Sequence, residues 1–94
     1  ATRVPLRTME ESLKVFPLAL KMAEFGNPAS VSDAGVGALA ARAAVRGALL
    51  NVKINAAGLK NRELADKLVG RAEAIAKEAA VLEEDVLKVV ESKI

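Results

Sequence analysis

Apolar residues recur along most of the chain with the spacing of α-helices, and no segment alternates between apolar and polar positions as a strand would. Turn-forming residues divide this pattern into three parts, at residues 8–25, about 30–55 and 61–94. The sequence therefore predicts an all-α bundle of about three helices, the last of them long, in a single domain over residues 1–94.

The first predicted helix opens at Thr8, because Glu11 follows at the spacing of a capping box and Pro5 keeps the preceding backbone extended. Its inward-facing residues are expected to be Leu13, Phe16 and Leu20, with Phe25 as a further candidate. Pro17 lies inside the segment, lacks a backbone donor and is expected to kink the helix or to mark its true start. Residues 26–28, Gly-Asn-Pro, end the segment.

The second predicted helix begins at residues 30–32, where a serine hydroxyl caps the first turn and Asp33 lies at the positive end of the helix dipole. It runs to about Asn55 and stops at Gly58. Three glycines interrupt its interior, and each costs about 1 kcal/mol relative to alanine. We therefore expect another helix or a ligand to approach this backbone closely.

The third predicted helix begins near Asn61 and carries a heptad pattern. One row of the pattern is Ala65, Ala72, Ala79 and Val86, and the other is Leu68, Ile75, Leu82 and Val89. Glutamate and lysine also recur four residues apart, which favours ion pairs on the exposed face. These pairs are Glu63 with Lys67, Glu73 with Lys77 and Glu84 with Lys88.

The composition excludes several kinds of chemistry. Hydrophobic residues make up 52% and charged residues 28%, as in a soluble globular domain. Cysteine and histidine are absent, which excludes disulfides, thiolate or imidazole metal sites and Ser-His-Asp triads within this chain. No metal site is therefore expected. The two aromatic residues, Phe16 and Phe25, are too few for the stacking surfaces of single-strand nucleic-acid binders.

Charge is unevenly distributed along the chain. The net charge is +2, but residues 1–62 hold nine basic and four acidic side chains, whereas residues 63–94 hold five and eight. An anionic ligand is expected on the basic part. No apolar run has the length of a signal peptide or a membrane span, so we expect a cytoplasmic protein that binds no membrane.

A helical projection of residues 30–55 places polar side chains on two opposite faces. Arg42, Arg46 and Lys53 form a basic stripe. The opposite, small-residue stripe consists of Asp33, Gly37, Ala44, Ala48, Asn51 and Asn55. The functional interpretation is an anion held by the arginines and a flat group against the small residues. The structural interpretation is that the arginines face solvent or pair with acidic residues of the last helix, and that the asparagines cap turns.

Asp33 is the best candidate for acid/base work because it lies beside Ser32 at a junction of turn and helix. Its structural alternative is helix capping. The acidic run at residues 83–85 cannot converge on one atom, because consecutive helical positions point in directions about 100° apart.

The segment from Gly26 to Asn55, with GNPASVSDAG and GALLNVKIN as its most specific parts, resembles the formiminotetrahydrofolate cyclodeaminase and methenyltetrahydrofolate cyclohydrolase family. VPLRTMEE before it and LKNREL after it extend the similarity over essentially the whole chain. Family members are about twice as long, so the sequence looks like a C-terminal half. The resemblance implies half of a larger all-α bundle that forms dimers.

The chemistry implied by the resemblance is one-carbon transfer on tetrahydrofolate. The substrate is a tetrahydrofolate derivative, mono- or polyglutamylated, without a tightly bound cofactor. The reactions are cyclisation of 5-formiminotetrahydrofolate to 5,10-methenyltetrahydrofolate with release of ammonia, or hydrolysis of the methenyl bridge. Asp33 would be the catalytic acid/base. The substrate-binding residues would be Ser32, Arg42, Arg46, Asn51 and Asn55.

Two other functions stay open from the sequence. The chain could be a non-catalytic helical assembly module, or an inactive fragment of such an enzyme, because its last helix carries a heptad and it is short for the family. The residues leave open whether the chain alone is catalytic. Nucleic-acid binding through Arg42, Arg46 and Lys53 is disfavoured by the small net charge.

Overall fold

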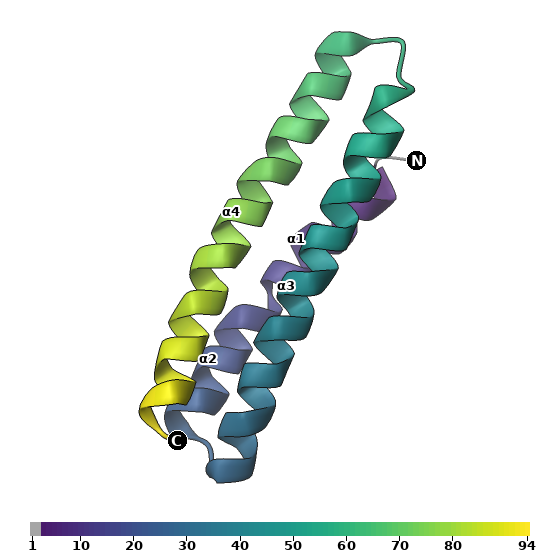
Figure 1. Ribbon diagram of the computed structural model, residues 1–94. Helices are drawn as coiled ribbons and strands as arrows, with labels where there is room; N and C mark the ends of the chain where they lie inside the picture. The colour runs from purple at the N-terminus through teal and green to yellow at the C-terminus, as the bar shows by residue number, and fades with distance from the viewer. Residues whose placement is uncertain (1–2) are drawn as a thin grey trace.

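The computed structural model describes residues 3–94 and is all-α over that range, as the sequence predicts. Its helices are α1 (Arg3–Leu13), α2 (Val15–Phe25), α3 (Pro28–Ala57) and α4 (Arg62–Ser92). Figure 1 shows α3 and α4 as a long antiparallel hairpin, with α1 and α2 running end to end along part of its length. The bundle is elongated, with extents of 51 × 17 × 14 Å.

The first predicted helix is divided in two at Lys14, as expected from Pro17. Proline has no N–H to donate to the carbonyl of Leu13, and its ring crowds that carbonyl. The backbone tightens instead, with the Lys14 N–H donating to the Glu11 carbonyl at 3.1 Å. Because of this break, α1 and α2 are two separate short helices that both pack along the α3–α4 hairpin.

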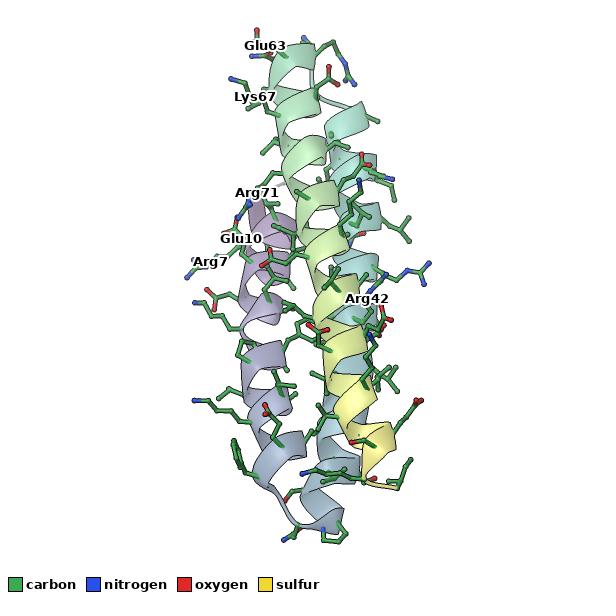
Figure 2. The ribbon with its side chains drawn as sticks, turned by 90° about the vertical axis from the view of Figure 1, so that its left-hand side faces the viewer. Arg7, Glu10, Arg42, Glu63, Lys67 and Arg71 are labelled. Carbon is green, nitrogen blue, oxygen red and sulfur yellow. The ribbon has the colours of Figure 1, made fainter. Side chains whose placement is uncertain are left out.

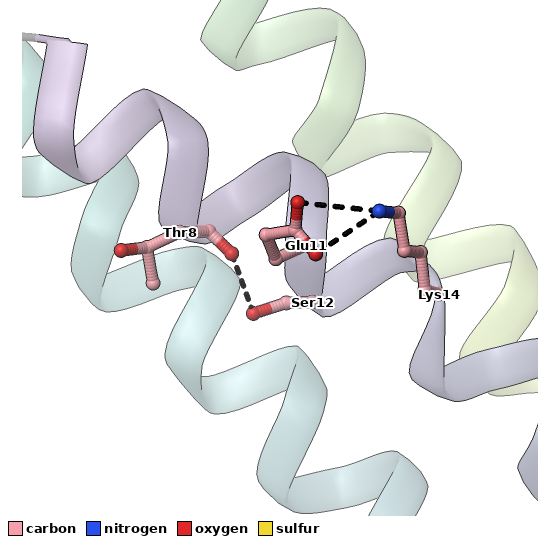
Figure 3. Close-up of polar contacts among 4 residues, drawn as sticks. All are labelled: Thr8, Glu11, Ser12 and Lys14. Carbon is pink, nitrogen blue, oxygen red and sulfur yellow. Dashed lines mark hydrogen bonds and ion pairs between the residues drawn. The ribbon is translucent and has the colours of Figure 1, made fainter.

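The expected start at Thr8 is wrong, because α1 already begins at Arg3. Pro5 falls in the first turn, where a missing N–H costs no helical hydrogen bond, so it does not delay the helix. Thr8 is therefore internal, and its hydroxyl donates to the Val4 carbonyl. Glu11 makes no capping box and contacts Lys14 at 3.1 Å (Figure 3).

The expected serine cap of the next helix is also wrong. α3 begins at Pro28 and is capped by Asn27, whose Oδ1 accepts a hydrogen bond from the Ser30 N–H at 2.9 Å. Proline suits the first helical position because its φ is already helical. Gly26 is extended, and a Cβ there would lie 2.4 Å from the Met22 carbonyl oxygen. Close chain approach therefore requires glycine at this turn.

The core lies along the axis where α1, α2 and α4 meet α3. Phe16 is 1% exposed as expected, but Phe25 is 84% exposed, so its predicted inward position is wrong. Besides Phe16, the buried residues of α1 and α2 are Met9, Ala19 and Ala23. Alanine at these positions allows the helices to approach closely.

The heptad of α4 is confirmed by burial against α3. Its small row, Ala65, Ala72, Ala79 and Val86, is fully buried, as is Ile75 in the other row. Gly35 of α3 faces Val90 of α4, which is the close helix approach expected from an interior glycine. At Gly37 and Gly47, by contrast, an added Cβ would have no neighbouring atom within 4 Å, so no such approach explains these two glycines.

Candidate functional site

The exposed side of α3 is unusually poor in charge for a helix surface. The 30 residues of α3 include four charged side chains, whereas the 31 residues of α4 include thirteen. Large apolar side chains are exposed instead, among them Val36 at 64%, Leu50 at 62% and Ile54 at 69%. We call this surface the outer seam, formed by Val36, Ala40, Ala43, Gly47, Leu50 and Ile54. A helix that is apolar on both sides is typical of the interior of a larger assembly.

Asp33 and Ser32 lie exposed on this outward side of α3, in its second turn. The helix starts at Pro28 and is capped by Asn27, so Asp33 does not cap it. Helix capping, the structural alternative for Asp33, is therefore excluded. Its carboxylate is accessible to a ligand or to a partner that covers the outer seam.

Asn51 and Asn55 do not join Asp33 within one chain. Asn51 lies five turns from Asp33 on the same face, which separates them by roughly 27 Å along the helix. Asn51 is exposed, and Asn55 is half-buried near the C-terminal end of α3. Neither amide therefore orients the Asp33 carboxylate from the same chain.

Arg42 occupies a different position, in a groove between α3 and α4. The groove has a volume of about 250 Å³ and is lined by Arg42, Leu49, Glu73, Ala76, Lys77 and Ala80. We call it the Arg42 groove. In Figure 2, Arg42 lies beside the α4 ribbon near the middle of the bundle. Its position follows from the helical period, which turns residue 42 toward α4.

The Arg42 guanidinium has no hydrogen-bond or ion-pair partner among residues 3–94. Its Nε is buried and makes no hydrogen bond, which costs about 1–3 kcal/mol for a polar group removed from water. Neither Arg42 nor Arg46 forms an ion pair with another described residue. The expected alternative, in which the arginines pair with acidic residues of the last helix, is not found within residues 3–94.

The basic stripe is therefore split. Arg46 and Lys53 are exposed, whereas Arg42 is half-buried against α4. Arg42 and Asp33 are nine residues apart on one helix, which places them on opposite faces of α3. A ligand of a single chain that touches both must therefore contact two surfaces of the bundle.

Sequence reasoning missed the contribution of α4 to the Arg42 groove. Glu73 and Lys77 were expected to form an ion pair on the exposed face, but of the three expected pairs Glu84–Lys88 is the one found, at 3.7 Å. The useful signal was available, because Ala72, Ala76, Ala79 and Ala80 mark the side of α4 that approaches α3. Lys77 lies next to these alanines in the sequence, which indicates that it lies near α3 and the Arg42 groove.

The residues that the structure describes contain no cluster of His, Cys, Asp or Glu suited to holding a metal ion. Among the same residues, no helix is both long enough and apolar enough to span a membrane.

Comparison with known proteins gives a consistent result over the whole chain. A family model described as formiminotransferase-cyclodeaminase matches residues 1–74. The chain is 42% identical over 94 residues to a methenyltetrahydrofolate cyclohydrolase of Methylorubrum extorquens, and covers 45% of it. It is 33% identical over 93 residues to a formimidoyltransferase-cyclodeaminase of Dictyostelium discoideum, and covers 17% of it. The chain thus spans less than half the length of these curated relatives.

Proposed function

Because the chain belongs to the formiminotransferase-cyclodeaminase family, we propose that it acts in folate one-carbon metabolism. The proposed reaction is cyclisation of 5-formiminotetrahydrofolate with release of ammonia, or hydrolysis of the 5,10-methenyl bridge. The observation that carries this proposal is the 42% identity to a methenyltetrahydrofolate cyclohydrolase over every residue of the chain. The proposed setting is the cytoplasm, without a tightly bound cofactor.

Both reactions pass through a tetrahedral carbon between the two folate nitrogens. In cyclisation, N10 attacks the formimino carbon and ammonia leaves; in hydrolysis, water attacks the methenyl carbon and one C–N bond breaks. Each reaction needs a base for the proton of the attacking group and an acid for the leaving nitrogen. We assign both roles to the carboxylate of Asp33, which is exposed and does not cap its helix. Ser32 precedes it and is available to bind the same end of the substrate.

The arginines of α3 suit the other end of a folate. Its glutamate carboxylates lie far from the reacting nitrogens, and guanidinium groups bind carboxylates through two parallel hydrogen bonds. Arg42 is half-buried and lines the groove between α3 and α4, and Arg46 is exposed one turn further along α3. Asp33 and Arg42 lie on opposite faces of α3, so the reacting end and the glutamate end of one substrate would contact different faces of this helix.

We further propose that two copies of the chain pair through the outer seam in an antiparallel arrangement. The seam is self-complementary about a point between Ala43 and Gly47, as a two-fold interface requires. Small residues lie at this centre, and the larger Val36 and Ile54 lie two turns to either side. In this register Val36 faces Ile54 of the second copy, and Ala40 faces Leu50.

The same register brings the separated polar residues of the outward face together. Asp33 and Asn51 lie on the same flank of the outer seam. Antiparallel pairing about the centre places Asn51 of the second copy roughly 9 Å along the axis from Asp33, instead of the roughly 27 Å within one chain. Long polar substrates span such a distance, so the proposed site includes residues from both copies.

Cross-linking tests this interface because the chain contains no cysteine of its own. A mixture of Ala40→Cys and Leu50→Cys chains is expected to give a disulfide-linked heterodimer under mild oxidation. Val81→Cys, at an exposed apolar position of α4, is the control and is expected to stay monomeric on denaturing gels. Equal cross-linking of the control, or a monomeric solution mass of the wild-type chain, would overturn the proposed pairing.

Calorimetric titration with tetrahydrofolate triglutamate, together with the solution mass, tests the proposed function. Saturable binding by a dimer supports it. A helical, self-associating chain that binds no folate would instead support the alternative, in which the chain serves only assembly.

A further inference from the structure

The outward face of α1 and α2 carries a second apolar surface, on other helices than the outer seam. Its residues recur at alternating spacings of four and three, and all of them are exposed: Val4, Thr8, Glu11, Val15, Leu18, Met22 and Phe25. We call this surface the α1–α2 row. Its largest apolar members face water within residues 3–94, with Leu18 at 67% and Phe25 at 84% exposed. Like α3, α2 is therefore apolar on both its buried and its exposed side.

The α1–α2 row continues across the break between the two helices. Lys14 keeps helical backbone angles, with φ −69° and ψ −18°, so the helical period carries over from α1 to α2. A groove of about 410 Å³ joins the helices on this face, and it is lined by Val4, Arg7, Thr8, Glu11, Ser12 and Val15. Alternating spacings of four and three are the pattern with which one α-helix packs along another. The pattern therefore specifies a helix as the occupant, in contact over roughly 33 Å.

One edge of the α1–α2 row is basic. Arg7, Lys14 and Lys21 are exposed there and recur every seven residues. Lys14 is paired with Glu11 of the row at 3.1 Å (Figure 3), whereas Arg7 and Lys21 form no ion pair with another described residue. Charges that flank an apolar row select the partner of a helix pair. The occupant is thus expected to carry carboxylates on the flank that meets this edge.

A second copy of the chain fits the α1–α2 row poorly. Antiparallel pairing of two rows would place Glu11 against Leu18 and remove its carboxylate from water, which is unfavourable. A two-fold axis would also set the basic edge of one copy against the same edge of the other. Pairing through α2 alone would offer four partly exposed apolar side chains from each copy. That is less than the about 800 Å² per partner that a stable interface buries.

We infer that the α1–α2 row is the docking surface for an amphipathic helix with an acidic flank, supplied by the part of a family protein that lies outside the match to this chain. The match takes up 45% of the Methylorubrum cyclohydrolase, so more than half of that protein is available to supply such a helix. The inference concerns a surface that neither the proposed reaction nor the proposed pairing through α3 uses.

Co-expression tests the inference with a defined probe, the segment of the Methylorubrum cyclohydrolase outside its match to this chain. The tagged 94-residue chain is expected to retain this segment at equal stoichiometry. A double variant, Leu18→Lys with Phe25→Lys, is expected to retain at least about tenfold less, because two charges enter an apolar contact. Lys21→Glu is expected to retain roughly threefold less, because it reverses one charge of the basic edge.

Val81→Lys is the matched control, since Val81 is an apolar side chain of α4 that is 59% exposed and lies outside the row. Its retention of the segment is expected to stay within about twofold of the wild type. All the replaced side chains are exposed and lysine favours helices, so circular dichroism is expected to show an intact fold in every variant.

Three results would overturn the inference. One is the absence of retention by the wild type, and another is an equal loss in the control and the double variant. The third is a solution mass of the chain alone that is lower in the double variant than in the wild type, because a second copy would then be the occupant.

The same measurements separate this inference from the proposed function. A complex that depends on Leu18 and Phe25 but converts neither folate substrate would leave the docking surface standing and contradict the proposed reaction. Folate turnover by the chain alone, without retention of the segment, would contradict the docking surface and leave the reaction standing.

Discussion

The Cγ1 methyl of Val90 lies 3.4 Å from the position that a Cβ on Gly35 would occupy. Gly35 and Val90 thus face each other across α3 and α4, at the end of the bundle nearest the C-terminus (Figure 1). At 3.4 Å an alanine methyl makes an ordinary van der Waals contact, but a larger side chain would have to displace Val90, which is 8% exposed.

Gly35→Ala is therefore expected to leave the free energy of unfolding unchanged or to raise it by up to about 1 kcal/mol, through the better helix propensity of alanine. Gly35→Leu is expected to lower it by about 1–3 kcal/mol through overpacking. Urea denaturation of both variants measures the difference. A stabilising Gly35→Leu would show that α3 and α4 do not pack at this distance.

Gly47 has open space around its Cα, unlike Gly35. Gly47→Ala is expected to raise the stability of the monomer by about 0.5–1 kcal/mol through helix propensity alone. The comparison is best made by denaturation at low protein concentration, where self-association through the outer seam does not contribute. Destabilisation of the dilute monomer would mean that this part of α3 is already covered within one chain.

Asn27 supplies the side-chain cap of α3, a role that the sequence pattern suggested for a serine. Asn27→Ala is expected to lower stability by about 0.5–2 kcal/mol, because the Ser30 N–H loses its acceptor. Ser32→Ala is the matched control at an exposed position in the next turn, and is expected to stay within about 0.5 kcal/mol of the wild type. Thermal unfolding followed by circular dichroism measures both. Equal losses would contradict the assigned cap.

Ile75 is the fully buried large residue of the α4 heptad. Ile75→Ala is expected to cost about 2–5 kcal/mol through lost burial and the cavity that remains. Val81→Ala removes an apolar side chain from the same helix where it is 59% exposed, and is expected to change stability by less than about 0.5 kcal/mol. A small effect of Ile75→Ala in urea denaturation would mean that the α3–α4 core is loosely packed.

The helical periodicity predicted the bundle and the α4 heptad because both depend on the local spacing of apolar residues. It misplaced the start at Thr8 because Pro5 was expected to delay the helix, although proline is tolerated in a first turn. It misplaced the start at residues 30–32 because serine and asparagine are both suitable caps, and here Asn27 is the one used. It placed Phe25 inside because the pattern continues through that position, yet the turn at residues 26–28 directs Phe25 to solvent.

The candidate site was harder to predict because it depends on contacts between helices. Angles around α3 identified Arg42 and Asp33 correctly as residues of opposite faces. They could not show that Arg42 is pressed against α4 or that Lys77 lines the same groove, since both facts depend on the relative rotation of two helices. The outer seam was not among the stripes that the angles around α3 predicted, and its exposure required the structure.

The most direct test of the account is steady-state conversion of 5-formiminotetrahydrofolate and 5,10-methenyltetrahydrofolate by the wild-type chain and by Asp33→Asn. The wild type is expected to convert at least one of the two. Asp33→Asn is expected to retain its helicity and to lose about 10²–10⁴-fold in kcat, the usual contribution of a general acid or base. No conversion of either substrate by the wild type, or undiminished turnover in Asp33→Asn, would contradict the account.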